Sequence, residues 1–140
     1  MPLPDSFRLE AATLRTSGFS STTIATAAAT TGSTIANQTA LDEFLTVEFD
    51  YSFATNPTAG KTVEIYLLYS VDGTNFSEES AVELIGSFSP DVDTSSHRRV
   101  IIKDYPLLPF AFKIHIKNVD TGQTITVTVN AYTHSSKVID

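Results

Sequence analysis

The sequence contains no cysteine and no tryptophan, and only 18% of its 140 residues are charged. Without cysteine, neither disulfides nor thiolate metal sites can form, so the fold must be held together by packing alone. No apolar run approaches the roughly 20 residues that a transmembrane helix needs. The first residues, MPLPD, lack the basic and apolar regions of a signal peptide. We therefore expect a soluble chain that is made without classical export and has no membrane partner.

The formal net charge of −7 repels phosphate backbones, so we expect no nucleic-acid partner. A length of 140 residues suits a single domain. Apolar residues make up 41% of the chain and include nine Phe and five Tyr, which is enough to build a core. Abundant threonine suits strands because its branched Cβ restricts χ1. The composition thus favours one β-rich domain.

Six segments carry strand signals, and in the stronger ones apolar and polar residues alternate with a period of two, as in half-buried strands. The clearest are residues 45–53 and 62–71. The others are residues 82–88, 98–103, 110–117 and 124–131. Turn signals such as Asp72-Gly73 separate them, and the single helical signal is a possible turn near residues 5–14. The pattern predicts an all-β fold with a single β-sandwich, of jelly-roll or immunoglobulin-like type, and leaves the strand order open.

Residues 16–39 are rich in Ser, Thr, Ala and Gly and supply few large apolar side chains. Such a segment gains little from burial and scarcely offsets its own ordering entropy. We therefore divide the chain into an extended N-terminal arm, residues 1–40, and a β-sandwich domain, residues 41–140. The arm either docks on a partner or adds edge strands to its own sheet, and the sequence leaves both open.

Two apolar residues of the second strong segment fall on its solvent side. Tyr66 and Leu68 alternate with Ile65 and Leu67, which share the expected core face. Aromatic residues are enriched at protein interfaces. Tyr66 and Leu68 are therefore candidate residues for self-association.

The sequence shows no constellation typical of an enzyme or a metal site. None of the three histidines, His97, His115 and His134, has a carboxylate at ligand spacing, so we expect ordinary surface histidines. Carboxylate pairs such as Glu48 and Asp50 are expected to be solvated. A phosphate-binding loop, a nucleophile elbow and an HExxH motif are all absent. We expect no catalytic residue, no metal and no cofactor.

Two segments resemble structural proteins of tailed bacteriophages. They are residues 66–76 (YLLYSVDGTNF) and residues 104–113 (DYPLLPFAFK), the latter followed by a turn and a Thr/Val-rich last strand. The chain is similar in kind to small capsid decoration, or cement, proteins and related head-fibre modules over about residues 41–133. The resemblance implies a homotrimer with a β-sandwich or jelly-roll body on the outer surface of the virion capsid. It also implies that the protein is made in the host cytoplasm, binds the major capsid protein and stabilises the shell.

The residues that contact the capsid do not follow from the resemblance, because residues 1–37 carry no motif that aligns with the family. As a hypothesis, the arm supplies the apolar anchors that bind the capsid: Phe7, Leu9, Phe19 and Ile24.

Two alternatives stay open. The first is a carbohydrate-binding β-sandwich module, whose sugar platform would draw on Tyr66, Tyr105 and Tyr132. The second is a neck or tail component of the same virion, which would use the same fold.

Overall fold

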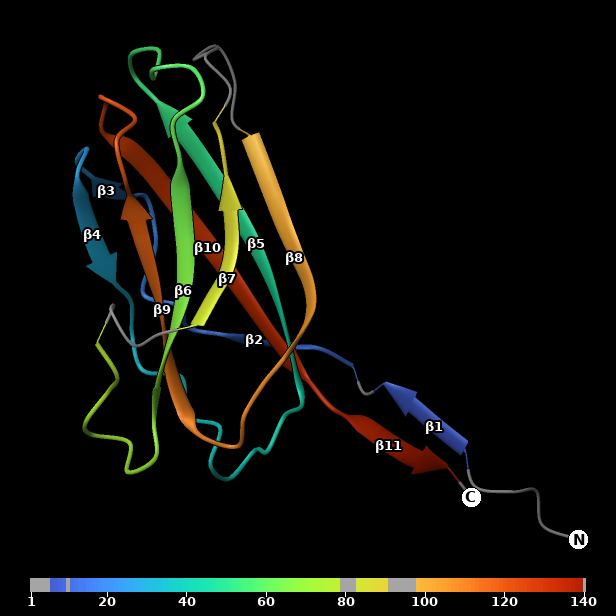
Figure 1. The fold of residues 1–140 in the computed structure, drawn as a ribbon. Coiled ribbons are helices and arrows are strands. Elements are labelled where there is room, and N and C mark those ends of the chain that lie inside the picture. The colour runs from blue at the N-terminus through green and yellow to red at the C-terminus, as the bar shows by residue number, and fades with distance from the viewer. Residues whose placement is uncertain (1–5, 10, 79–82, 91–97, 140) are drawn as a thin grey trace, which may run out of the picture.

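The computed structural model describes residues 6–9, 11–78, 83–90 and 98–139, with the backbone alone described for 6–9 and 136–139. These ranges form eleven strands and no helix, and two antiparallel sheets pack into a sandwich (Figure 1). One sheet contains, in spatial order, β2 (Thr13–Arg15), β10 (Ile125–His134), β5 (Phe44–Phe53) and β8 (Arg98–Pro106), with β3 (Thr22–Ile24) also paired to β10. The other contains β4 (Ala28–Thr31), β9 (Ala111–Asn118), β6 (Val63–Ser70) and β7 (Glu83–Phe88). The predicted all-β sandwich is confirmed.

The strands pair in a nested order. The innermost pair is β6 with β7, followed outward by β5 with β8, β4 with β9, and both β2 and β3 with β10. All of these pairs are antiparallel. Such a nest is one long hairpin rolled into two sheets, and this order is consistent with the jelly-roll alternative.

The core forms because the inward positions of both sheets are almost uniformly apolar. In β5, buried and half-buried residues alternate without a break over ten positions, as a period of two requires. Phe49 of β5 reaches Phe88 of β7 in the facing sheet, with ring centroids 5.4 Å apart. The largest fully buried side chains are Phe49, Phe112, Ile24, Leu45, Ile65, Leu67, Ile114, Ile116, Ile125, Val47, Val63 and Val127.

The N-terminal segment supplies edge strands to both sheets. β2 and β3 pair with opposite ends of β10, and β4 pairs with β9. Between β2 and β3 the chain stays attached to β10, because the Ser17 hydroxyl donates to the Val129 carbonyl at 2.7 Å and the Val129 N–H donates to the Phe19 carbonyl at 3.1 Å. The sequence left open whether residues 1–40 dock on a partner or add edge strands to their own sheets. The structure shows that they add edge strands.

Outside the sandwich, β1 (Ser6–Leu9) and β11 (Ser136–Ile139) form a separate antiparallel pair, which we call the terminal ribbon. Figure 1 shows it extending from one end of the sandwich. The helical turn expected near residues 5–14 is therefore wrong, because long-range pairing with β10 and β11 makes strands of residues 6–9 and 13–15. No helix in the described part of the chain could span a membrane.

Candidate functional site

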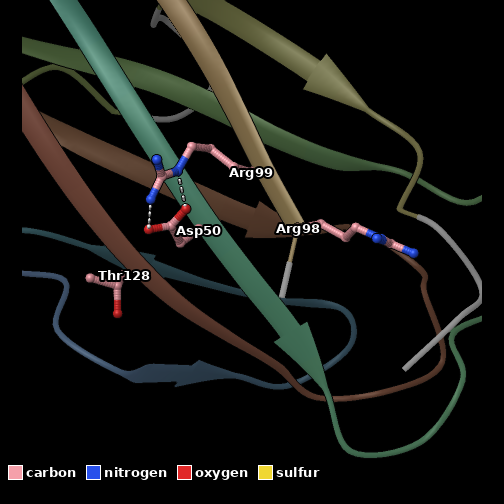
Figure 2. Close-up of a pocket in the computed structure, with 4 residues that line it drawn as sticks. All are labelled: Asp50, Arg98, Arg99 and Thr128. Carbon is pink, nitrogen blue, oxygen red and sulfur yellow. Dashed lines mark hydrogen bonds and ion pairs between the residues drawn. The ribbon is translucent and has the colours of Figure 1, made fainter. Parts of the chain in front are cut away.

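A shallow hollow lies on the outer face of the five-stranded sheet. It has a volume of about 540 Å³ and is lined by Asp50 of β5, Arg98 and Arg99 of β8, and Thr128 of β10. Figure 2 shows the Arg99 guanidinium turned toward Asp50, while Arg98 points away from it. Thr128, Asp50 and Arg99 are successive cross-strand partners, so they form one row across three strands.

Arg99 is held between two carboxylates. Its Nε lies 2.7 Å from Asp50 Oδ1 and its Nη2 lies 3.3 Å from Oδ2. Its Nη1 is 3.6 Å from Glu48 Oε2, and Glu48 Oε1 in turn accepts a hydrogen bond from the Asn130 amide at 3.3 Å. The hydrogen bonds and charge of Asp50 raise the pKa of Arg99 above its usual value. The Glu48 and Asp50 pair, expected to be simply solvated, is thus tied into an ordered polar network.

A second hollow of about 440 Å³ adjoins the first and shares Thr128 with it. This hollow lies where the chain between β2 and β3 passes beside β10. It is lined by residues 14–20 and 128–130. We call the two hollows together the polar groove. Asp50, Arg99, Thr128 and Asn130 mark its centre, and Leu14 marks its end on β2.

The groove combines hydrogen-bond donors and acceptors with apolar surface, for example from Leu14 and Val129. Hydroxyl, amide, carboxylate and guanidinium groups line it, and Asp50 and Arg99 neutralise each other. Within the described ranges, no group of three or more His, Cys, Asp or Glu residues could hold a metal ion. The arrangement is suited to binding.

The four residues proposed as capsid anchors fall into two groups. Phe19 and Ile24 are 3% and 1% exposed and belong to the core between the sheets, so as folded they offer almost no surface to a partner. Phe7 and Leu9 lie in the terminal ribbon, opposite Val138 and Ser136, and their side chains are outside the described part. The sequence could not distinguish these two pairs, because in both of them the apolar residues are isolated within a polar segment.

The two proposed self-association residues are less accessible than expected. Leu68 is 7% exposed although it lies on the opposite face of β6 from the core residue Leu67. Tyr66 is half-buried beside His115, with ring centroids 6.0 Å apart. Leu68 therefore has little side-chain surface to offer a second copy, and Tyr66 keeps part of its surface.

Two of the histidines were wrongly expected on the surface. His115 is 8% exposed, and its Nδ1 lies 2.8 Å from the Thr31 hydroxyl of the neighbouring strand. His134 is 7% exposed and stacks on Phe44 at a centroid distance of 5.4 Å. Cross-strand neighbours cover both rings, and the sequence did not reveal which strands would be neighbours. His97 lies outside the described residues.

The three tyrosines proposed as a sugar platform do not lie on one surface. Tyr66 belongs to the four-stranded sheet and Tyr132 to the five-stranded sheet. Tyr105 packs against the core, and burial followed by its hydrogen bond with Glu83 raises the pKa of its hydroxyl. The prediction that these three rings could form one flat sugar-binding platform is therefore wrong.

The turn after β6 is built around the carboxylate of Asp72. The backbone N–H groups of Asn75 and Thr74 and the hydroxyl of Ser70 donate to Oδ1, each at 2.8 Å. The Asn75 side-chain amide donates to Oδ2 at 2.8 Å. Gly73 has a φ of +77°, which suits a residue without a Cβ. These hydrogen bonds, those from the Asn75 and Thr74 backbone first, hold the pKa of Asp72 well below its usual range.

Replacing Asp72 by asparagine is expected to flatten the dependence of stability on pH. Because the folded-state pKa is lowered, the charged carboxylate stabilises the fold above its unfolded pKa of about 3.9, and this contribution is lost as the pH falls further. The thermal midpoint of the wild type should therefore drop more steeply than that of Asp72→Asn between about pH 5 and pH 2. Parallel midpoint curves for the two proteins would contradict this role.

No protein-family model and no curated protein matches the sequence. Among solved structures, a chain in the structure of infectious bursal disease virus, Gx strain, is similar with a TM-score of 0.54 and 5% identity, over 92% of this chain and 32% of that chain. The Gt strain of the same virus gives a TM-score of 0.49 and 7% identity, over 94% of this chain and 33% of that chain. What the Gx comparison shows is a shared fold. This chain spans about a third of the length of the viral chain.

Proposed function

We propose that the chain is a virion structural protein that binds the outer surface of a capsid shell and stabilises it, as phage decoration proteins do. The observation that supports this most is the fold. The nested strand order is consistent with a jelly roll, an architecture used in viral capsids, and the fold is shared with a chain from a virus structure. The partner in this proposal is the major capsid protein, and the chain acts as a homotrimer without catalysing a reaction.

The mechanism is mass action. A protein that binds the assembled shell and not its free subunits shifts the equilibrium away from disassembly, by an amount set by affinity and concentration. A trimer that engages three neighbouring capsid subunits gains further from avidity. Stabilisation therefore needs many modest contacts and no reactive site.

In this proposal the terminal ribbon makes the capsid contact. It extends from one end of the sandwich, so it can bind a surface while the body stands clear of it (Figure 1). A two-stranded ribbon is marginally stable by itself, and its outer edges can accept a further strand from a partner. Within the ribbon, the register places Phe7, Leu9 and Val138 on one face and Arg8 and Lys137 on the other.

The variant Phe7→Ala/Leu9→Ala is expected to bind shells at least about tenfold more weakly than the wild type. Burying a Phe or Leu side chain contributes about 1.5–3 kcal/mol, and about 1.4 kcal/mol corresponds to a factor of ten. Ile139→Ala is a matched control, because Ile139 pairs with Ser6 on the opposite face of the ribbon. Co-sedimentation with empty shells of the virus that encodes the chain measures the difference.

Equal binding by the wild type and Phe7→Ala/Leu9→Ala would contradict the role of the ribbon. Deleting all of residues 1–40 would not test the role of the ribbon in capsid binding. That deletion removes β2, β3 and β4 together with the core residues Phe19, Ile24 and Ile35, so it would also unfold the sandwich.

A further inference from the structure

We propose that the polar groove on the outer face of the five-stranded sheet binds a neutral oligosaccharide. The proposal rests on the juxtaposition of Thr128, Asp50 and Arg99 in one row across three strands, with Asn130 and Glu48 in the next row. It is independent of the capsid-binding role, which we place in the terminal ribbon.

The groups in the groove match the chemistry of sugar hydroxyls. Each sugar hydroxyl both donates and accepts hydrogen bonds. The Thr128 hydroxyl accepts from the Ser21 backbone N–H at 3.0 Å and can also donate. The Asp50 carboxylate accepts, and the guanidinium of Arg99 and the amide of Asn130 donate. Figure 2 shows the Arg99, Asp50 and Thr128 side chains on adjoining strands around the first hollow. Donors and acceptors thus lie side by side on three adjoining strands.

The groove is preorganised. Arg99, whose side chain is 55% exposed, is oriented by the 2.7 Å and 3.3 Å hydrogen bonds to Asp50 and by Glu48 at 3.6 Å. The amide of Asn130 is held by Glu48 at 3.3 Å. Side chains that are already ordered lose little further conformational entropy when a ligand binds. This matters for sugars, whose own hydroxyls must first give up water.

An apolar contact for a sugar ring is present at the β2 end of the groove. Leu14, which is 60% exposed, is the cross-strand partner of the half-buried Tyr132. Tyr132 lies two positions after Asn130 and four after Thr128, so the period of two places it on the same face of β10. An aromatic ring and an aliphatic side chain beside polar groups can pack against the C–H face of a pyranose.

Charge and polarity argue against the other ligand classes. Three arginines line the groove, and two of them are charge-paired: Arg99 with Asp50 at 2.7 Å and Arg15 with Asp42 at 3.7 Å. This pairing weakens the attraction of the groove for phosphates. A protein interface has an apolar centre depleted of charged residues. Here charged groups occupy the centre, and the exposed apolar residues Leu14 and Ile101 lie on the outer strands β2 and β8. A ligand that is uncharged and rich in hydroxyls needs neither an excess of positive charge nor an apolar centre, so it fits this groove.

The test is a glycan array of neutral and sialylated oligosaccharides, with each hit measured again by calorimetry. We expect binding to neutral oligosaccharides that Asp50→Asn weakens at least about tenfold, because a hydrogen bond to a charged group is lost and Arg99 loses its main partner. Asn130→Ala is a second variant that leaves the Asp50–Arg99 pair intact, and it should also weaken binding. Asp120→Asn is the matched control, since it makes the same change in the exposed Lys61–Asp120 pair, which is outside the groove.

Three results would overturn the proposal: no binding to any neutral oligosaccharide, binding to sialylated ones alone, or binding that Asp50→Asn and Asn130→Ala leave unchanged. Shell binding by Asp50→Asn should equal that of the wild type, because the ribbon is untouched. Failure of the groove proposal and failure of the capsid proposal are therefore distinguishable.

Discussion

Replacing Phe49 by alanine is expected to lower the free energy of unfolding by about 3–5 kcal/mol, the usual cost of removing a buried aromatic ring. Phe49 is fully buried in the middle of β5, which pairs on both sides within its sheet. Its ring lies against Phe88 of the facing sheet at 5.4 Å and near Tyr51 at 6.1 Å. The substitution therefore leaves a cavity between the two sheets that neighbouring strands cannot easily fill.

Urea unfolding of the wild type and Phe49→Ala measures this loss. Phe110→Ala is the matched control, because Phe110 is half-buried just before β9 and lies 6.5 Å from Tyr69 at the sheet margin. Phe110→Ala should lower the free energy of unfolding clearly less than Phe49→Ala does. Equal costs at the two positions would mean that the space between the sheets is not the main source of stability.

Replacing Asn118 by leucine is expected to cost at least about 2 kcal/mol, although the two side chains are similar in size. Asn118 is fully buried at the end of β9. Its amide donates to the Ile24 carbonyl at 3.1 Å and to the Gln123 carbonyl at 2.8 Å, and its Oδ1 accepts from the Thr121 hydroxyl at 2.6 Å. One side chain thus joins β9, β3 and the turn into β10, and leucine would leave buried polar groups without these partners.

The same unfolding experiment applies to Asn118→Leu, with Asn130→Leu as its control. Asn130 is half-buried on the outer face and its described side-chain hydrogen bond is to Glu48 at 3.3 Å. A surface position of this kind usually changes stability by no more than about 0.5 kcal/mol. A loss at Asn118 no larger than at Asn130 would contradict the structural role of this corner.

The strands of the body were predictable because their signal is local. The alternation in residues 45–53 matches β5, and the segment 62–71 contains β6 almost whole. The edge strands β2, β3 and β4 and the ribbon strand β11 were not, since they contain few large apolar residues. They exist because β10, β9 and β1 offer them backbone partners far away in the sequence.

The polar groove was predictable in part. Glu48 and Asp50 fall on the outward side of a strand by alternation alone. Their contact with Arg99, 49 residues along the chain from Asp50, depends on the pairing of β5 with β8 and had no local signal. Phe19 and Ile24 show the opposite error, because apolar residues in a polar segment were interpreted as partner contacts when they complete the core.

The central claim, that the chain binds the outside of a capsid shell in many copies, is tested most directly by size-exclusion chromatography with light scattering. The purified chain would be measured alone and after mixing with empty shells of the virus that encodes it. The account predicts a trimer alone and co-elution with shells at a copy number that matches the repeated sites of the shell surface. A chain that leaves the shells bare, or that binds each shell at a single vertex, would contradict it.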